Sequence, residues 1–319
     1  MTSAHTRSRP RYRGPAMPSP PGASIGHLVR QWRQHRGLTQ ERLADGATVS
    51  LKHLSFVENG RARPSREMVL HLARHLDVPL RERNALLVAA GYAPAYGDTP
   101  WDDPALDEVR AGLAEVMAAH EPWPAIVVDR RWDLLAANRA AALFTEGVDP
   151  SLLEPPVNVL RLCLHPAGLA RRIVNIAHWH EHVIGNLTGL TPAGRRGIAT
   201  DADLEGLRDE LDGYRPTDGP PTTGATPAGG LAVPLHLTTP DGDLRLLATA
   251  ATFSTAVDVT LSELLVETFL PADAETRERL QQRHERSRAR QRPPGTLPPT
   301  PAEPPDHADP HTHTREEPS

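Results

Sequence analysis

The sequence has little cysteine, little lysine and few aromatic residues. Among its 319 residues Cys163 is the only cysteine, Lys52 is the only lysine, and aromatic residues make up 4%. A single cysteine excludes an intrachain disulfide and a zinc site made of paired cysteines. The chain also lacks a run of about 20 predominantly apolar residues and the apolar stretch of a secretory signal. We therefore expect a cytoplasmic protein with no membrane partner.

Charge is distributed unevenly along the chain, although the formal net charge is only -5. Residues 1–92 hold 15 Lys+Arg against 6 Asp+Glu, whereas the rest of the chain holds 20 against 34. The basic first third predicts a nucleic-acid partner, and the acidic remainder predicts a different one. The length favours two folded units rather than one.

Composition divides the chain into five segments. Residues 1–22 combine arginines with prolines and predict a disordered basic arm, and residues 276–319 predict a disordered tail rich in Pro and His. Between them we expect a helical unit at 23–92, a linker at 93–103 and a second folded unit at 104–275.

The first folded unit has the apolar periodicity and the capping residues of five short helices. Apolar residues three and four apart predict a helix from Ile25. Thr39, Ser50 and Ser65 are suitable N-caps for the next three helices, and a fifth is expected at about 80–90. These elements predict a compact all-α bundle.

The second and third predicted helices have the spacing of a helix-turn-helix, whose second helix lies in the major groove of DNA. Burial of Leu54 and Val57 would turn the opposite face of the third helix toward the bases. Lys52 on that face can donate to a guanine, and arginines after the helix can hold phosphates. The residues expected to contact DNA are Gln40, Ser50, Leu51, Lys52, His53, Ser55, Phe56, Asn59, Arg61 and Arg63.

This segment resembles the lambda-repressor-like (XRE) helix-turn-helix over residues 24–91. The likeness rests on Gly37-Leu38-Thr39-Gln40 and on Leu54-Ser55-Phe56-Val57-Glu58-Asn59-Gly60-Arg61. It implies a five-helix fold, a double-stranded DNA operator and a homodimer. It also implies that Gln40 grips a phosphate and that Leu51, Lys52 and Phe56 face the bases. The alternative is a five-helix module that binds protein, with its arginines on a solvated surface.

One position departs from the family pattern. Thr48 stands where the family usually has glycine, in the turn between the second and third helices. Because a β-branched residue resists positive φ, we expect the second helix to end early at Asp45 and the turn to be rebuilt.

The second folded unit predicts an α+β domain with a small antiparallel sheet. One hairpin is expected at 125–128 and 132–136, and another at 231–237 and 244–253 around the turn Pro240-Asp241-Gly242. A loop is expected at 213–230. Helices are expected at 106–119, from 138, and at 157–164, 168–188, 201–212 and 261–269.

The opening hairpin, at 124–138, resembles that of a PAS-like sensor domain. Together with 155–161 and 269–273, it resembles the MmyB-like ligand-binding domain that follows such helix-turn-helix modules, over about residues 104–273. The resemblance implies a small apolar, fatty-acid-like ligand in a PAS-type cavity.

Asn158, Arg161 and His165 are spaced three and four apart in an otherwise apolar segment. Arg161 can bind a carboxylate bidentately, so these residues are predicted to hold the acid head group of a ligand above an apolar cavity. The alternative is that they tie the helix to neighbouring backbone or to acidic side chains.

No metal site, cofactor or catalytic centre is predicted. His71 and His75, like His178 and His182, are four residues apart but lack further ligands at a diagnostic spacing. Cys163 lies in an apolar run, where cysteine is usually inert. No phosphate-binding glycine loop or nucleophile elbow is present.

The sequence therefore predicts a transcription regulator whose first domain binds DNA and whose second domain senses a small apolar ligand. Alternatively, the second domain recruits another protein and binds no small molecule. A sealed cavity of roughly a few hundred cubic ångströms, lined by apolar side chains, would favour the sensor, and a filled core would favour the interaction platform. A fused enzyme, the third hypothesis, would need a cleft with convergent titratable groups.

Overall fold

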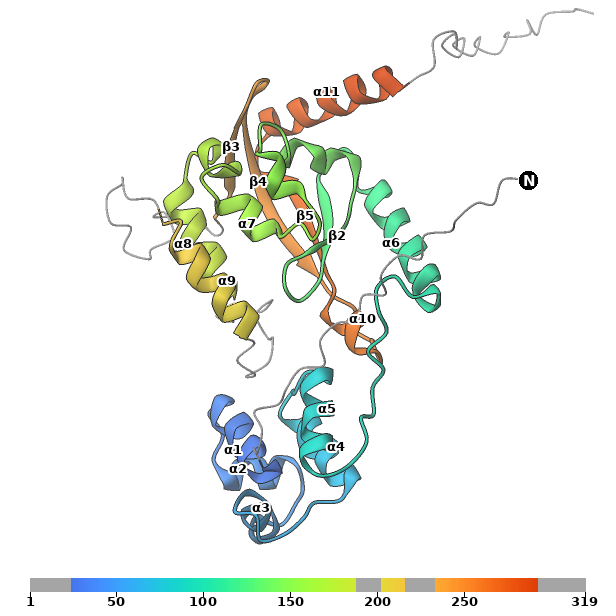
Figure 1. Cartoon of the computed structure of the whole chain (residues 1–319), viewed down its shortest axis with the longest axis vertical. Helices are drawn as coiled ribbons and strands as arrows, with labels where there is room; N and C mark the ends of the chain where they lie inside the picture. Colours follow the sequence, from blue (N-terminus) through green and yellow to red (C-terminus); the bar gives the residue numbers. More distant parts are fainter. Residues whose placement is uncertain (1–23, 188–201, 216–232, 292–319) are drawn as a thin grey trace, which may run out of the picture.

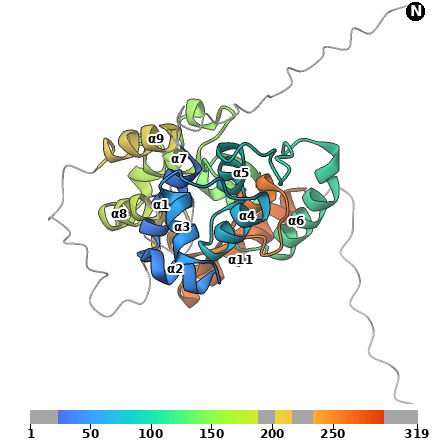
Figure 2. The same cartoon turned by 90° about the horizontal axis from the view of Figure 1, so that it is seen from below.

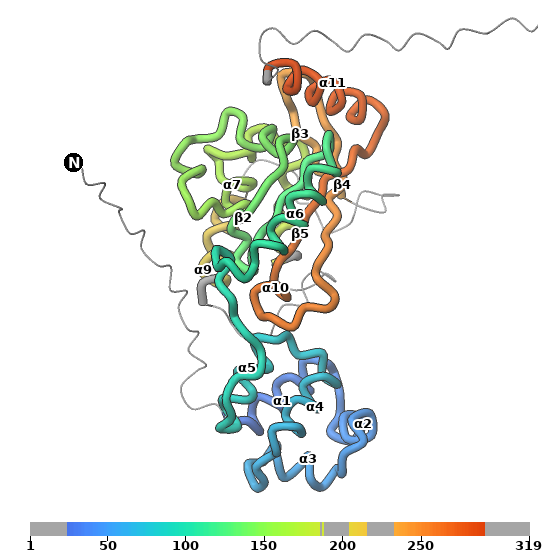
Figure 3. Tube along the Cα trace, turned by 90° about the vertical axis from the view of Figure 1, so that its right-hand side faces the viewer, coloured from blue at the N-terminus to red at the C-terminus, as the bar shows by residue number. Residues whose placement is uncertain are grey.

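The computed structural model describes residues 24–187, 202–215 and 233–291, which form a helical bundle followed by an α+β domain (Figure 1). The bundle lies at one end of the molecule and helix α11 lies at the other (Figures 1 and 3). Across the described ranges, no helix has the length and apolarity needed to cross a membrane. The predicted arm at 1–22 lies outside the described residues.

Five helices form the first domain, as the periodicity and capping residues predict. They are α1 (Ile25–His35), α2 (Gln40–Gly46), α3 (Leu51–Glu58), α4 (Arg66–His75) and α5 (Leu80–Ala89). The hydroxyls of Thr39, Ser50 and Ser65 each accept a hydrogen bond from the first turn of the following helix, which satisfies an otherwise unpaired N–H. The buried core of the bundle includes Trp32, Leu43, Leu54, Leu72 and Leu87.

The turn between α2 and α3 differs from the prediction. Instead of ending at Asp45, α2 continues to Gly46, and Thr48 itself adopts a φ of 53°. The N–H of Thr48 donates to Asp45 O at 3.0 Å, and the N–H of Val49 donates to Ala44 O at 2.9 Å. This is the Schellman pattern that ends a helix with a left-handed residue. The hydrogen bonds of the turn thus hold a β-branched residue where glycine is usual.

A five-stranded antiparallel sheet forms the centre of the described part of the second domain, in the order β2-β1-β5-β4-β3. Both predicted hairpins are present, as β1 with β2 and β3 with β4. β5 joins the two hairpins in the middle. The strands are β1 (Ala125–Val128), β2 (Leu134–Ala137), β3 (Leu235–Thr239), β4 (Gly242–Ala251) and β5 (Leu265–Pro271).

The predicted helix at 261–269 is wrong. A short helix, α10 (Val259–Glu263), ends before Leu264, and the chain then enters β5. β5 pairs with β1 on one side and β4 on the other. A short apolar run fits either a helix or a buried strand, and here two neighbouring strands supply the backbone partners.

Helices cover both faces of the sheet (Figures 1 and 3). On one face, α6 (Asp107–Ala119) packs Leu113 and Met117 against Ala125 and Val127 of β1. The alternate residues of the same strand, such as Ile126, belong to the core on the other face. That face is covered by the 3-10 helix η2 (Arg139–Phe144) and by α7 (Val159–Leu164), α8 (Ile176–Leu187) and α9 (Ala202–Asp212).

The single helix predicted at 168–188 is divided into a 3-10 helix, η4 (Leu169–Arg172), and α8. Between them Ile173 forms a β-bridge with Leu237 of β3. The Asn175 side chain donates to Pro234 O at 2.8 Å. Contact with the edge of the sheet therefore interrupts the helix.

The chain continues beyond the sheet as α11 (Ala274–Gln291). The sequence predicted a disordered tail from residue 276. The structure instead continues α11 to Gln291, because Leu280 of this helix is buried in the core against the sheet. The Asp273 carboxylate also accepts a hydrogen bond from the N–H of Thr276, at 2.7 Å, and so caps the helix. Residues 292–319 lie outside the described part.

Candidate functional site

The outward face of α3 is exposed at the end of the molecule (Figure 2). Leu51 is 46% exposed, and the Lys52 ammonium lies 5.7 Å from the centroid of the Phe56 ring. Leu54 and Val57, on the opposite face, are 1% and 0% exposed. Packing of these two residues therefore orients α3 with Lys52 and Phe56 away from the core, as the helical periodicity predicts.

A buried carboxylate, Glu58 at the end of α3, holds three helices together. It accepts hydrogen bonds from Arg33 at 2.7 and 2.9 Å, from Gln40 Nε2 at 2.7 Å and from Arg30 Nε at 3.4 Å. Burial alone would raise the pKa of Glu58, but the hydrogen bonds from Arg33 and Gln40 outweigh it and lower that pKa. Gln40, predicted to grip a phosphate, thus uses its amide N–H inside the domain.

Several other predicted DNA-contact residues have local partners at the ends of α3. The Ser50 hydroxyl caps the helix. At its other end the Asn59 amide donates to Ser55 Oγ at 3.3 Å, while Asn59 Oδ1 accepts from Arg30 at 2.7 Å. His53 is half-buried. These contacts fix the recognition helix against α1.

The two arginines after α3 are placed differently. Arg61 is exposed. Arg63 donates to Ala90 O at 3.0 Å and lies over the Tyr92 ring, with 5.3 Å between the guanidinium carbon and the ring centroid. Arg63 therefore caps carbonyl groups at the end of α5, and Arg61 is the better placed of the two to reach a phosphate.

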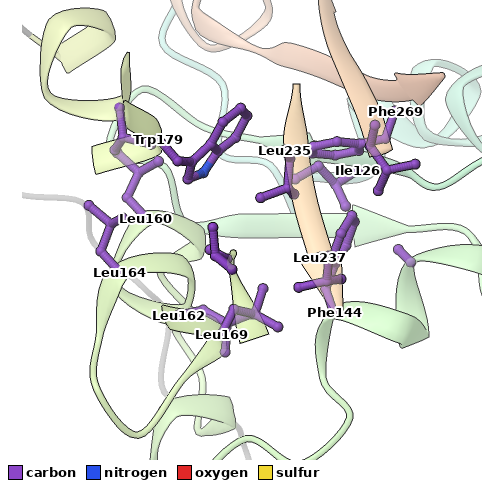
Figure 4. Close-up of a cluster of buried hydrophobic side chains, with 14 of the residues drawn as sticks. Ile126, Phe144, Leu160, Leu162, Leu164, Leu169, Trp179, Leu235, Leu237 and Phe269 are labelled. Atoms are coloured by element: carbon purple, nitrogen blue, oxygen red, sulfur yellow. The ribbon is translucent and has the colours of Figure 1, made fainter. Parts of the chain in front are cut away.

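The second domain contains a partly open apolar cavity of about 350 Å³ between the sheet and the helices α7 and α8. Its walls come from the aliphatic and aromatic side chains that Figure 4 shows converging from both sides, including Ile126, Leu160 and Trp179. Phe144 and Phe269, also in the wall, make an edge-to-face contact with 4.8 Å between ring centroids. Apolar side chains thus dominate the lining, as is typical of small-molecule sites.

A few polar groups line the same cavity. The indole N–H of Trp179 donates to Cys163 Sγ at 3.2 Å, and burial raises the pKa of the Cys163 thiol to about 12. Burial also lowers the pKa of His182, so its imidazole favours the neutral form. Glu267 of β5 and Arg139 of η2 are also among the lining residues. The sequence prediction missed these residues because they come from four segments far apart in the chain.

Asn158, Arg161 and His165 are not among the lining residues of this cavity. Arg161 instead pairs bidentately with Glu210 of α9, at 2.6 and 2.7 Å, and this contact raises the pKa of Arg161. Asn158 caps α7 and donates to Arg131 O at 2.7 Å. His165 Nδ1 accepts from a backbone N–H two residues on. A ligand carboxylate would have to displace Glu210 to reach Arg161, so a head-group site there remains a prediction.

Of the histidines considered as metal ligands, His71 has a backbone partner, with its Nε2 atom 2.6 Å from Ala47 O. His180, on the same helix as His178 and His182, has its Nε2 atom 2.9 Å from Leu211 O. Over the ranges that the structure describes, no group of three or more His, Cys, Asp or Glu side chains is placed to hold a metal ion.

The two domains meet where α5 faces α10 (Figure 1). Arg81 of α5 donates twice to Glu263 of α10, both at 2.8 Å, and twice to Asp98 of the linker, at 2.8 and 3.1 Å. Asp258, which caps α10, accepts from the Thr99 hydroxyl at 2.7 Å. The DNA-binding bundle, the linker and the second domain therefore share one hydrogen-bonded junction.

Glu82, next to Arg81 on α5, lies at this junction with a buried Oε2 atom. The residues that the structure describes offer that atom no hydrogen-bond partner. Burial, with a smaller contribution from the Glu263 carboxylate, raises the pKa of Glu82 to about 7.

These features define a two-domain transcription regulator, with a helix-turn-helix bundle and a ligand-binding type of α+β domain. Residues 109–282 match the MmyB-like transcription regulator ligand binding domain, and residues 24–86 match a helix-turn-helix domain. The chain belongs to the family of MmyB-like transcription regulators.

Relatives of known name resemble the first domain. The chain is 36% identical over 67 residues to the transcriptional regulator ClgR of two strains of Mycobacterium tuberculosis, CDC 1551 and H37Rv. The match covers 21% of this chain and spans 57% of the length of each relative. The crystal structure of the clp gene regulator ClgR from C. glutamicum is 27% identical and covers 23% of this chain and 90% of that one, with a TM-score of 0.19.

Proposed function

We propose that the protein is a cytoplasmic, sequence-specific DNA-binding regulator whose second domain senses a small apolar, fatty-acid-like ligand. The observation that carries the proposal is the position of exposed Lys52 and half-buried Phe56 on the outward face of α3, at one end of a molecule whose other domain contains an apolar cavity.

The DNA-binding part is supported by how α3 is held. Glu58 fixes the end of α3 to α1 and α2, so the recognition face is organised before DNA arrives. Lys52 is then placed to donate to a guanine in the major groove, and Phe56 to contact a thymine methyl. Exposed Arg61 would bind a phosphate. A homodimer would present two such helices to the two half-sites of an operator.

The ligand-binding part is supported by the volume and chemistry of the cavity. About 350 Å³ falls in the range typical of small-molecule sites. Burial of the lining against an alkyl chain would remove apolar surface from water, which favours binding. The cavity is partly open rather than sealed, but the core beside the sheet is not filled, and this favours the sensor over an interaction platform.

The junction supplies a route by which the ligand can change DNA binding. β5 contributes Glu267 and Phe269 to the cavity wall and follows α10 after a single residue. α10 in turn carries Glu263, the partner of Arg81 in the DNA-binding bundle. A ligand that binds one position of β5 more tightly would therefore favour one position of the bundle. Only a ligand whose affinity differs between the two arrangements of the domains can change DNA binding.

The test begins with duplexes selected from a random pool by the full-length protein. Fluorescence anisotropy then compares a selected duplex with a scrambled one, with and without laurate. We expect preference for the selected duplex, and a change in its affinity on addition of laurate.

Arg81→Ala should reduce the effect of laurate, while Arg74→Ala, on the exposed surface of α4, should not. Failure to bind any duplex would refute the DNA-binding part, and an unchanged affinity with laurate would refute a free fatty acid as the regulating ligand.

A further inference from the structure

A second hollow, which we call the arginine groove, lies between α11 and η2 and has a volume of about 400 Å³. Unlike the apolar cavity, it is dominated by cationic groups. Four arginines and one histidine line it, with two carboxylates. These residues are Arg139, Arg283, Arg286, Arg290, His284, Glu146 and Asp241.

The carboxylates of the groove do not balance its guanidinium groups. Arg283 pairs with both Glu146 and Asp241, and Arg286 pairs with Asp241 at 2.9 Å. Within the described ranges, no carboxylate forms an ion pair with Arg139 or Arg290, the two remaining arginines. The groove therefore keeps a positive charge that a multiply charged anion would neutralise.

A further guanidinium adds to this excess. Arg172 Nη2 lies 3.9 Å from the Glu146 carboxylate. That atom is buried and has no hydrogen-bond partner within the part of the chain that the structure describes. Burial lowers the pKa of Arg172, and the neighbouring Arg283 lowers it further. Glu146 is thus shared between Arg172 and Arg283, and its carboxylate forms no hydrogen bond with Nη2 of Arg172.

The arginine groove and the apolar cavity share a wall. Arg139 and Ala142 line both of them. The two residues are three apart on η2, and side chains at this spacing eclipse each other in a 3-10 helix. The two spaces therefore adjoin along one edge of η2, at Arg139 and Ala142.

The apolar cavity itself is a poor place for an anionic head group. Glu267 is among its lining residues, and an anionic head group beside a carboxylate would be repelled. Arg139 is the one arginine among the lining residues within the described part of the chain, and it also lines the groove. An anionic end of the ligand is therefore drawn outward, toward the groove.

We propose that the ligand is an amphiphile that spans both spaces, with an acyl chain in the apolar cavity and a phosphorylated, multiply charged head group in the arginine groove. An acyl thioester of coenzyme A has this chemistry. The proposal rests on the proposed sensor function and specifies its ligand more narrowly than a free fatty acid.

Isothermal titration calorimetry on the full-length protein would test this with lauroyl-CoA, laurate, free coenzyme A and inorganic pyrophosphate. We expect lauroyl-CoA to bind more tightly than the other three probes by about tenfold or more. Arg286→Ala/Arg290→Ala should weaken lauroyl-CoA to the level of laurate and leave laurate unchanged. Arg290→Ala alone breaks no ion pair within the described ranges and should weaken lauroyl-CoA in part. Arg288→Ala, on the same helix but outside the groove, should have no effect.

The outcomes separate this proposal from the broader one. If laurate and lauroyl-CoA bind equally, or if the double variant binds lauroyl-CoA normally, the head-group site is refuted while the apolar sensor stands. If free coenzyme A or pyrophosphate binds as tightly as lauroyl-CoA, the groove is a separate anion site and the amphiphile is refuted. If neither laurate nor lauroyl-CoA binds, the sensor function itself fails.

Discussion

Lys52 stands alone on the exposed face of α3 as the single ammonium group of the chain. Changing Lys52 to Ala should lower discrimination between a selected and a scrambled duplex by about 1–3 kcal/mol if it donates to a guanine. Fluorescence anisotropy on both duplexes measures this. His27→Ala, on the exposed surface of α1, serves as the control. Equal losses on the two duplexes would instead assign Lys52 to phosphate binding.

Thr48 shows the cost of a side chain in a left-handed turn. Its φ of 53° is unfavourable for a residue with a Cβ atom, by about 1–2 kcal/mol. Thr48→Gly should therefore raise the free energy of unfolding, by about 1 kcal/mol after the greater freedom of glycine in the unfolded chain is included. Chemical denaturation measures the change. Thr48→Ala retains the Cβ atom and should give no such gain; equal effects of Gly and Ala would rule out relief of strain.

Residue-level prediction from the sequence succeeded where the cause is local and missed partners far away in the chain. The N-caps and the outward face of α3 follow from spacing within one or two helical turns. Gln40 and Glu58 are 18 residues apart, and Arg161 and Glu210 are 49 apart. Pairings over such distances depend on the packing of whole helices, which no local pattern encodes. The acidic partner of Arg161 corresponds to the alternative left open by the sequence.

At the scale of elements, the contact between α5 and α10 predicts a dependence of stability on pH. The pKa of Glu82 is raised to about 7 in the folded protein, against an ordinary value of 4.5. The folded state therefore binds the proton of Glu82 more tightly than the unfolded state does. This tighter binding stabilises the fold below pH 4.5, and the stabilisation is lost as the pH rises toward 7. Glu82→Gln should remove this loss and be more stable above pH 7, by on the order of 2 kcal/mol.

Calorimetric unfolding of the wild type and Glu82→Gln between pH 4.5 and 8 would measure this difference. It should be smallest at the acidic end and grow with pH. Glu67→Gln, an exposed position on α4, should run parallel to the wild type. A constant difference between Glu82→Gln and the wild type at all pH values would mean that Glu82 does not titrate in this range.

The elements that the sequence misassigned are those fixed by contacts across the sheet. Residues 265–269 were expected in a helix and instead belong to the central strand β5, because β1 and β4 pair with it from both sides. α8 begins later than expected because the residues before it contact β3. α11 extends past the predicted start of the tail because Leu280 is buried in the core. The five bundle helices were all predicted, and a side chain caps the first turn of α1, α2, α3 and α4.

At the scale of the whole molecule, the sequence predicted two domains, but it did not predict their shared junction. The junction requires Arg81 and Glu263, which are 182 residues apart. The cavity likewise depends on segments from β1 to β5. Its apolar character follows from the composition of the second domain, whereas its volume depends on how the helices sit on the sheet.

The division of charge between the two parts of the chain makes DNA binding sensitive to salt. Removal of residues 1–22, which contain Arg7, Arg9, Arg11 and Arg13, should weaken binding chiefly at low salt. The slope of log affinity against log salt should fall by roughly one for each lost phosphate contact. Anisotropy titrations at several salt concentrations measure this slope. An unchanged slope would exclude an electrostatic role for the arm.

The recognition helix α3 and helix α11, which lines the arginine groove, lie at opposite ends of the long axis of the molecule (Figures 1 and 3). A duplex seated on α3 leaves the groove open to solvent. An amphiphile entering there can therefore exchange while the protein remains on its operator. The fraction of the regulator that carries the amphiphile would then follow the concentration of the amphiphile promptly, without waiting for dissociation from the chromosome.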